Sequence, residues 1–211
     1  MNELVRDRLG GLHSAECVLY SVDFAAVERL QAEGRWEDAG ELLAQAARRL
    51  EAAGVDLLLL CTNTMHKVAD QVQAAVDVPL LHLADTTAEA ARAAGMTRVG
   101  LLGTAFTMEQ TFYSERLEAA GLEVVVPAPR DRALVHRVIY DELCLGVVRE
   151  ESRQAYREIM QRLVADGADG IALSCTEIEL LVGPEDSAVP VLRTTRLHVE
   201  AAVERALAPL L

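Results

Sequence analysis

The chain has 211 residues, enough for one large domain or two small ones, and carries a formal net charge of −13. Such a charge opposes binding to phosphate backbones and anionic lipid headgroups, so we expect no nucleic acid and no membrane surface as a partner. The apolar runs have the length of strands, and the N-terminus lacks the hydrophobic segment of a signal peptide. We therefore expect a cytoplasmic protein.

Hydrophobic periodicity and glycine stops predict alternating helices and strands in the first part of the chain. The helices are expected at 2–9, 25–31, 36–53, 65–75 and 86–94, and the strands at 17–24, 57–60 and 79–83. The helix at 36–53 is the clearest, because its apolar residues recur at spacings of three and four and Gly54 follows it.

The second part of the chain shows the same alternation of helices and strands. Strands are expected at 98–102, 123–126, 171–174 and 189–192, and helices at 107–120, 133–143, 152–165 and 197–207. Strands that alternate with helices indicate a mostly parallel sheet with helices on its faces, so the expected fold class is α/β.

Two stretches more than a hundred residues apart share one design. Each begins with a glycine and an aspartate, continues through an apolar run, and ends in Cys-Thr and a polar residue, at 61–63 and again at 175–177. Such a run reads as a buried parallel strand, and ligands bind at the carboxyl ends of these strands. Similarity also follows downstream, where Thr-Thr recurs at 86–87 and 194–195. The repeat suggests two related lobes with Cys61 and Cys175 facing each other across one cleft.

The paired thiols have a structural and a catalytic interpretation. A cysteine at a strand end is often only a small packing residue. The pairing favours catalysis, because both sulfurs are expected near helix N-termini, where a thiolate is stabilised. Cys17 and Cys144 lack this setting and are expected to be packing residues. No Cys-x-x-Cys pair is present, so we expect reduced thiols and no redox or zinc-ribbon motif.

Polar residues follow both cysteines. Asn63, Thr64, Thr176 and Glu177 could each cap a helix, and capping is compatible with ligand contacts. Hydroxyl and N–H groups at such a turn bind a carboxylate, whereas a glutamate binds an ammonium group. Together they suit an amino acid.

No metal and no cofactor are expected. His66, five residues after Cys61, could be a metal ligand, and so could His82 and Asp85. No further Cys/His pair at ligand spacing accompanies them. The glycines at 10–11 and 103 are too sparse for a dinucleotide or phosphate motif. His136 and His198 are expected at the surface or at the lobe interface, although His198 could line the cleft.

Several motifs together resemble the aspartate/glutamate racemase family. They are Cys-Thr-Asn-Thr-Met-His-Lys at 61–67, the segments 101–104 and 106–109, and Ser-Cys-Thr-Glu-Ile at 174–178. The segments 8–15 and 140–144 resemble the broad-specificity amino-acid racemase branch in particular. The resemblance covers nearly the whole chain and implies a cofactor-independent homodimeric racemase with two pseudo-twofold-related α/β lobes, comprising residues 1–92 plus 196–211, and 93–195.

The resemblance also implies a mechanism. Cys61 and Cys175 would each act as base for one enantiomer and as acid for the other. Matching positions assign the α-carboxylate to Asn63 and Thr64. The ammonium group is assigned to Thr176 and Glu177, and two further threonines are expected to line the pocket, Thr104 and Thr107.

Three departures from the family leave other functions open. Family members generally begin with a strand and a Gly-Gly-Met-Ser-type loop, and this chain starts inside the following helix, so we expect an incomplete, rearranged or externally completed sheet. Arg193 stands where the family usually has aspartate, and Cys144 where strict aspartate racemases tend to have lysine. The alternatives are a non-catalytic or impaired amino-acid or carboxylate-binding fragment, and a single-cysteine isomerase or decarboxylase acting on carboxylic acids.

Overall fold

The computed structural model describes residues 1–208. The chain forms two compact units, one made of Met1–Leu60, Met65–His82 and the segment from Val199 onward, the other of Cys61–Thr64 and Leu83–His198. The lobe limits expected after residues 92 and 195 stay a prediction. Within residues 1–208, no helix combines the length and the apolar character that a membrane crossing requires.

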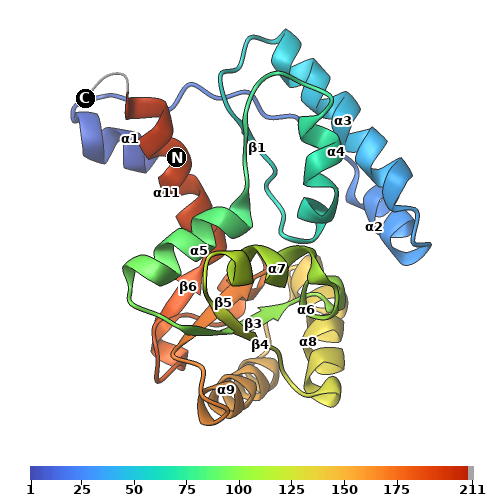
Figure 1. Ribbon diagram of the computed structural model, residues 1–211, viewed down its shortest axis with the longest axis vertical. Helices are drawn as coiled ribbons and strands as arrows, with labels where there is room; N and C mark the ends of the chain where they lie inside the picture. The colour runs from blue at the N-terminus through green and yellow to red at the C-terminus, as the bar shows by residue number, and fades with distance from the viewer. Residues whose placement is uncertain (209–211) are drawn as a thin grey trace. The chain divides into compact units, whose positions relative to one another are not determined.

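The first unit is mainly helical and contains a short parallel strand pair. Its elements are α1 (Asn2–Leu9), α2 (Phe24–Ala32), α3 (Trp36–Ala52), β1 (Leu58–Leu59), the 3-10 helix η1 (Thr64–Val68), α4 (Ala69–Gln73) and β2 (Leu80–Leu81) (Figure 1). β1 pairs with β2, with Leu58 opposite Leu80. The apolar face of α3 supplies Leu43 to a core that also contains Leu58, Val68 and Val72.

The strand expected at 17–24 is wrong. Residues 17–23 have no regular secondary structure, and Asp23 caps α2 by accepting a hydrogen bond from the backbone N–H of Ala25 at 3.2 Å. Val18 and Tyr20 favour strands, but this propensity measures how well a side chain fits a sheet and does not create a pairing partner. The helix expected at 65–75 is also divided, into η1 and α4.

The second unit contains a four-stranded parallel sheet in the order β4-β3-β5-β6. The strands are β3 (Arg98–Gly103), β4 (Glu123–Val125), β5 (Gly170–Ser174) and β6 (Val191–Arg193). The helices are α5 (Leu83–Ala93), α6 (Ala105–Glu109), α7 (Thr111–Ala119), α8 (Pro129–Asp141), η2 (Leu143–Leu145), α9 (Glu150–Ala165), α10 (Ile178–Leu181) and η3 (Pro184–Asp186). α11 (Thr194–Leu207) begins in this unit and continues into the first from Val199. These parallel sheets with flanking helices confirm the α/β class.

Both faces of the four-stranded sheet are buried. Leu102 belongs to a core with Tyr156 of α9, whereas its neighbour Leu101 belongs to a second core with Tyr113 of α7. This alternation follows from the period of two along a strand. Helices on both sides leave only the ends of the strands available for ligands.

The single helix expected at 107–120 is two helices. Thr104 starts α6, because its hydroxyl accepts a hydrogen bond from the backbone N–H of Thr107. Gln110 then adopts an extended backbone, with φ −105° and ψ 153°, and separates α6 from α7. The early cap places Thr104 and Thr107 directly beyond the end of β3.

Candidate active site

The carboxyl ends of β3 and β5 lie side by side. Gly103 pairs with Ser174 in the sheet, so the next residues, Thr104 and Cys175, emerge at the same edge. A Cβ atom on Gly103 would lie 2.8 Å from the carbonyl oxygen of Ser174, a distance at which one of them must shift. Glycine therefore permits the close approach of the two strand ends.

The segment Cys61–Thr64 is hydrogen-bonded to this edge. The Thr64 hydroxyl lies 2.9 Å from that of Thr104. The Asn63 side chain donates to the Thr194 hydroxyl at 3.3 Å, and this hydroxyl donates to the carbonyl oxygen of Leu173, in β5, at 2.8 Å. Asn63 and Thr64 are both buried. The predicted residues Asn63, Thr64 and Thr104 are therefore brought together at the ends of β3 and β5.

Thr107 completes this group of hydroxyls. Its hydroxyl lies 3.3 Å from that of Thr104, and its side chain is fully buried. Thr194 is the residue of this group that was not among the predicted site residues. The available signal was its place in the repeated Thr-Thr at 194–195.

A carboxylate lies beside the second thiol. The Cys175 Sγ atom donates to Oε2 of Glu177 at 3.1 Å, and the Thr176 hydroxyl donates to the same oxygen at 2.5 Å. Within residues 1–208, no hydrogen bond or ion pair joins Glu177 to any other side chain, and Oε1 takes part in neither bond. Glu177 can therefore accept a hydrogen bond from an ammonium group of a ligand.

The two thiols differ in their surroundings. Cys175 is buried, and this burial, followed by the nearby charge of Glu177, raises the pKa of its thiol well above the ordinary value. Cys61 is exposed as a residue, although partial desolvation still raises the pKa of its thiol. Both cysteines precede helices as expected, but burial opposes the expected stabilisation of their thiolates. The helices that follow are the short η1 and the four-residue α10, whose dipoles are small.

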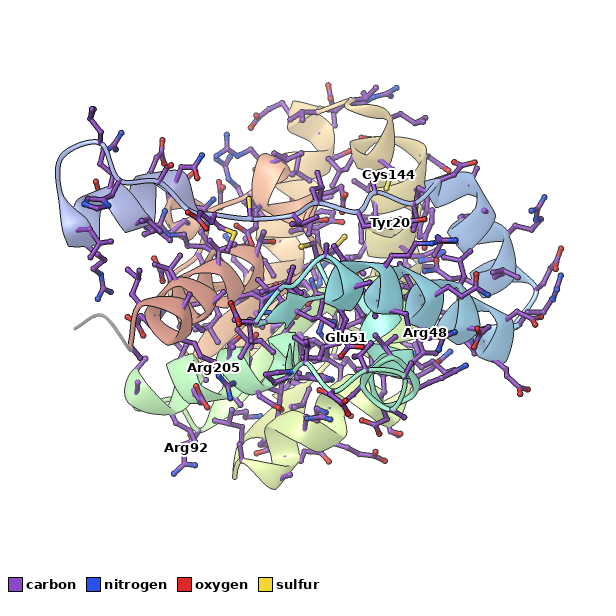
Figure 2. The ribbon with its side chains drawn as sticks, turned by 90° about the horizontal axis from the view of Figure 1, so that it is seen from above. Tyr20, Arg48, Glu51, Arg92, Cys144 and Arg205 are labelled. Atoms are coloured by element: carbon purple, nitrogen blue, oxygen red, sulfur yellow. The ribbon has the colours of Figure 1, made fainter. Side chains whose placement is uncertain are left out.

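The other two cysteines also differ from each other. Cys144 lies in η2, directly after α8 (Figure 2), and packs against the core that contains Cys175. Burial, and next the charge of Glu177, raises the pKa of the Cys144 thiol to about 11. Cys17 is exposed, so the expectation that it packs in a core is wrong.

Three of the histidines make ring contacts or hydrogen bonds. The rings of His66 and His82 lie edge to face with centroids 4.4 Å apart. Residues 1–208 contain no group of three or more His, Cys, Asp and Glu side chains suited to a metal ion. His136 is half-buried and accepts a hydrogen bond at Nδ1 from the backbone N–H of Ala105 at 3.1 Å, and His198 is buried.

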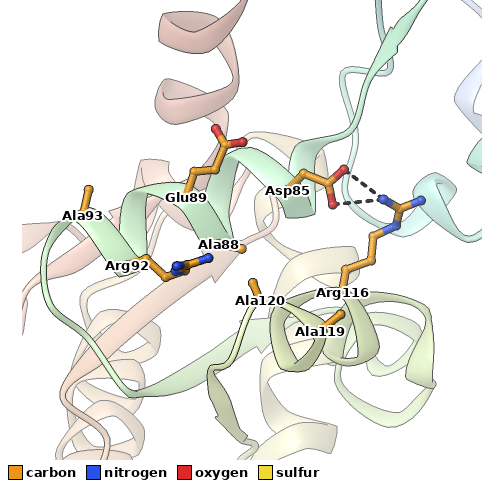
Figure 3. Close-up of a pocket in the computed structure, with 8 residues that line it drawn as sticks. All are labelled: Asp85, Ala88, Glu89, Arg92, Ala93, Arg116, Ala119 and Ala120. Carbon is orange, nitrogen blue, oxygen red and sulfur yellow. Dashed lines mark hydrogen bonds and ion pairs between the residues drawn. The ribbon is translucent and has the colours of Figure 1, made fainter.

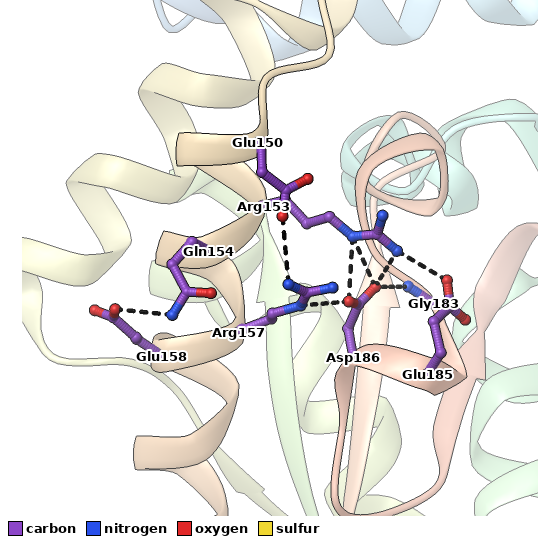
Figure 4. A network of polar contacts seen from close by, with 8 residues as sticks. All are labelled: Glu150, Arg153, Gln154, Arg157, Glu158, Gly183, Glu185 and Asp186. Atoms are coloured by element: carbon purple, nitrogen blue, oxygen red, sulfur yellow. Dashed lines mark hydrogen bonds and ion pairs between the residues drawn. The ribbon is translucent and has the colours of Figure 1, made fainter.

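Two further carboxylates hold the segment that follows Glu177. Glu179 accepts the backbone N–H of Thr195 at 2.9 Å and the Arg193 guanidinium at 3.0 Å. Asp186 is enclosed by Arg153, Arg157 and the backbone N–H of Gly183 (Figure 4). Burial alone would raise the pKa of Asp186, but its hydrogen bonds lower it to about 2. Arg193, the charge reversal noted above, thus has an acidic partner within the unit.

A cavity of about 570 Å³ lies elsewhere in the second unit, between α5 and α7 (Figure 3). Arg116 contacts both carboxylate oxygens of Asp85 at 2.9 Å at this cavity. None of the predicted site residues lines it. The cavity is therefore separate from the ends of β3 and β5.

Comparison with known proteins gives one consistent result. The Asp/Glu/hydantoin racemase family matches residues 1–202. A candidate Asp/Glu racemase from Yersinia pestis superimposes with a TM-score of 0.90 and 52% identity, over 98% of this chain and 90% of the other. An aspartate racemase homologue from Pyrococcus horikoshii gives 0.83 and 34%, over 97% and 89%. The broad specificity amino-acid racemase RacX of Bacillus subtilis is 26% identical over 165 residues, 77% of this chain and 70% of RacX.

Proposed function

Since the chain belongs to the Asp/Glu/hydantoin racemase family, we propose that it racemises an amino acid without a cofactor, with Cys61 and Cys175 working on opposite faces of the α-carbon. The observation that carries this proposal is the hydrogen-bonded junction at the strand ends. Thr64 bonds to Thr104 after β3, and Asn63 reaches β5 through Thr194. This junction ties the segment that begins with Cys61 to the sheet edge that bears Cys175.

The polar groups of the junction suit the two ends of an amino acid. Asn63 has a second amide hydrogen besides the one given to Thr194, and the hydroxyls of Thr64, Thr104 and Thr107 can rotate to donate to a carboxylate. Glu177 would accept the ammonium group at Oε1, next to Thr176. In this arrangement the α-carbon lies between the carboxylate-binding group and Glu177.

The proton transfers then follow from the two thiols. The Cys61 thiolate takes the α-proton, so that the Cα–H bond breaks and an S–H bond forms. The electron pair is delocalised into the substrate carboxylate. The Cys175 thiol donates its proton to the opposite face of the planar carbon, leaving the other enantiomer, a Cys61 thiol and a Cys175 thiolate. The reverse reaction exchanges the roles of the two residues.

The asymmetry of the thiols assigns their resting states. Cys175 donates its hydrogen to Glu177, and the raised pKa of its thiol favours the protonated form at neutral pH. Cys61 lies in the more exposed position. We therefore assign the resting acid to Cys175 and the resting base to Cys61.

The test is the exchange of the α-proton in deuterium oxide. The wild-type protein, incubated separately with single enantiomers of a panel of amino acids, should incorporate α-deuterium and produce the opposite enantiomer. The matched variants are Cys61→Ser, Cys175→Ser and the control Cys17→Ser, which changes an exposed thiol. The control should keep wild-type rates. Absence of exchange with every amino acid would refute the proposal.

The same experiment separates two cysteines from one. If both cysteines act as bases, Cys61→Ser and Cys175→Ser should each lose α-proton exchange, and the enantiomer affected most should differ between the two variants. If Cys61→Ser keeps full exchange from both enantiomers, a single-cysteine isomerase or decarboxylase acting on carboxylic acids replaces the racemase.

Two expectations from the sequence belong to this proposal, a homodimer and a cytoplasmic location. Sedimentation equilibrium should give twice the chain mass, and fractionation of the native cells should recover the protein with the cytoplasmic fraction. A monomer at micromolar concentration would contradict the first expectation, and recovery outside that fraction would contradict the second.

A further inference from the structure

The cavity between α5 and α7 is open because small side chains line it. Four of its lining residues are alanines, Ala88 and Ala93 on α5 and Ala119 and Ala120 at the end of α7. Methyl groups do not fill the space between these two helices, so a volume of about 570 Å³ remains. This volume lies within the range of small-molecule sites, roughly 300–1,000 Å³.

Two contacts fix the two helices that form the walls of the cavity. In the core, the hydroxyls of Thr87 on α5 and Tyr113 on α7 lie 3.2 Å apart, and both side chains are fully buried. At the cavity itself, one nitrogen of Arg116 contacts both carboxylate oxygens of Asp85 at 2.9 Å (Figure 3). Small-molecule sites are usually largely pre-formed, and the two contacts give this cavity the same property.

The charged side chains that line the cavity are balanced. They are two acids, Asp85 and Glu89, and two arginines, Arg92 and Arg116. The Arg92 guanidinium is directed toward Ala88, along the α5 side of the cavity (Figure 3). Within residues 1–208, the Glu89 and Arg92 side chains form no hydrogen bond or ion pair. The Arg92 guanidinium is therefore available to a ligand.

This distribution of charge favours a ligand that carries both signs. The carboxylates of Asp85 and Glu89 oppose the approach of a simple anion to Arg92, and the two guanidiniums oppose a simple cation. A zwitterion can present its carboxylate to Arg92 and its ammonium group to Asp85. Asp85 can accept this ammonium group while it holds Arg116, because an ionised carboxylate has about four acceptor sites.

The spacing along α5 favours a short zwitterion. Ala88, toward which the Arg92 guanidinium is directed, lies three residues from Asp85, which corresponds to about 5 Å along a helix. A carboxylate and an ammonium group on one carbon atom fit this short span better than charged groups at the two ends of a long chain. The chemical class that suits the cavity is therefore a small α-amino acid.

We propose that the cavity between α5 and α7 is a second binding site, which takes a small α-amino acid with its carboxylate on Arg92 and its ammonium group on Asp85. None of the residues assigned to racemisation lines this cavity. The inference therefore does not depend on the proposed function.

The test counts bound alanine by equilibrium dialysis of the full chain with radiolabelled alanine. The label counts both enantiomers, so racemisation does not disturb the count. When the wild-type protein is saturated, Arg92→Gln should bind about one alanine per chain fewer, because the carboxylate of the ligand loses its guanidinium. Ala119→Phe should give the same loss, because its ring fills the cavity. Arg205→Gln removes an exposed guanidinium that does not line the cavity and should match the wild-type protein.

Two further measurements test the zwitterion. Propionate and ethylamine each lack one of the two charged groups, and neither should displace the alanine that Arg92→Gln loses. Asp85→Asn should weaken the binding of this alanine about tenfold, the effect of one charge-assisted hydrogen bond. Arg116→Gln breaks the same ion pair but keeps the Asp85 carboxylate, so it should weaken the binding less.

Three results would overturn the inference. They are equal binding of alanine by Arg92→Gln and the wild-type protein, displacement of the alanine by propionate, which indicates a simple anion site, and a lower sedimentation mass of Arg92→Gln, which indicates an interface between copies of the chain. An alanine bound at the strand ends is retained in Arg92→Gln, so the two sites are counted separately. Loss of one alanine in Arg92→Gln and Ala119→Phe supports the second site even if the protein exchanges no α-proton.

Discussion

The two Cys-Thr segments share a design in the sequence but are held by different chemistry. The first, Cys61–Thr64, is fixed by neutral bonds from Asn63 and Thr64 to threonine hydroxyls. The second is surrounded by carboxylates, with Glu177 on the Cys175 thiol and Glu179 on the following helix. Equivalent positions at strand ends therefore do not produce equivalent thiols.

In the proposed two-thiol mechanism, this difference gives the site a defined resting state. Racemisation needs one base and one acid at the start of each turnover. Burial and then the charge of Glu177 raise the pKa of the Cys175 thiol, whereas partial desolvation raises the pKa of the Cys61 thiol. The predictions below test this contrast, beginning with the largest expected effect.

Replacing either catalytic thiol should have the largest effect. Cys61→Ser and Cys175→Ser should each lower kcat for racemisation by about 10²- to 10⁴-fold, because a serine hydroxyl is a far weaker base than a thiolate. The measurement is circular dichroism of the substrate with each starting enantiomer. Circular dichroism of the protein should be unchanged. A loss below about tenfold in either variant would contradict the two-thiol mechanism, because that thiol would then be dispensable.

Asp186→Asn should destabilise the second unit by about 3 kcal/mol, because it leaves the guanidiniums of Arg153 and Arg157 without their buried partner. Urea unfolding measures this loss. The matched control is Glu185→Gln, which removes an exposed partner of Arg153 and should cost less than about 0.5 kcal/mol. Equal losses in both variants would show that burial of the carboxylate contributes nothing.

The same carboxylate predicts a pH dependence. The pKa of Asp186 is about 2, below the ordinary 3.8, so ionisation stabilises the folded state. This stabilisation of about 2 kcal/mol is present above about pH 4 and is lost as the pH falls toward 2. Urea midpoints between pH 5 and pH 2.5 should therefore fall more steeply for wild-type protein than for Asp186→Asn. Parallel pH profiles would contradict the assignment.

Glu177→Gln tests the asymmetry directly. After burial, the charge of Glu177 is the next cause that raises the pKa of Cys175, so its removal should lower that pKa. The ascending acidic limb of the pH–rate profile for the enantiomer deprotonated by Cys175 should then move to lower pH, while KM rises through the lost ammonium contact. Glu179→Gln removes the same charge two residues away and should leave the limb in place. A shift of equal size in both variants would exclude a specific Cys175–Glu177 contact.

Thr104→Val should have the smallest effect, about 1 kcal/mol of unfolding free energy, because it removes the hydroxyl that joins Thr64 and Thr107 while keeping the shape of the side chain. Thermal unfolding should detect a decrease of roughly 2–4 °C. The exposed Thr111→Val is the control and should change little. No loss in Thr104→Val would mean that the neutral anchoring of the Cys61 segment is weak.

Local patterns were sufficient for most of the fold. The apolar run before Cys175 is bounded by glycine and a polar turn, and the bounds of β5 agree closely with those of this run. The strand expected at 17–24 failed because pairing depends on a distant partner, which propensity does not supply. The single helix expected at 107–120 was wrong for a related reason, because one extended residue, Gln110, interrupts an otherwise continuous apolar pattern.

The residues of the site were more predictable than their chemistry. The repeat of the two segments indicated Asn63 and Thr64 as neighbours of the strand ends, and the family resemblance indicated Thr104. Their hydroxyls and amide are hydrogen-bonded there. The raised pKa values of the thiols were not predictable, because burial and the approach of Glu177 to Cys175 are properties of the folded chain. The same holds for Asp186, whose partners lie on α9, about thirty residues earlier.

The most direct test of the two-thiol account is a crystal structure with a bound α-methyl amino acid, which occupies the site but has no α-proton to lose. The account predicts the Sγ atoms of Cys61 and Cys175 on opposite faces of the α-carbon, each within about 4 Å of it. Sulfur atoms on the same face, or a ligand bound out of reach of either one, would contradict it.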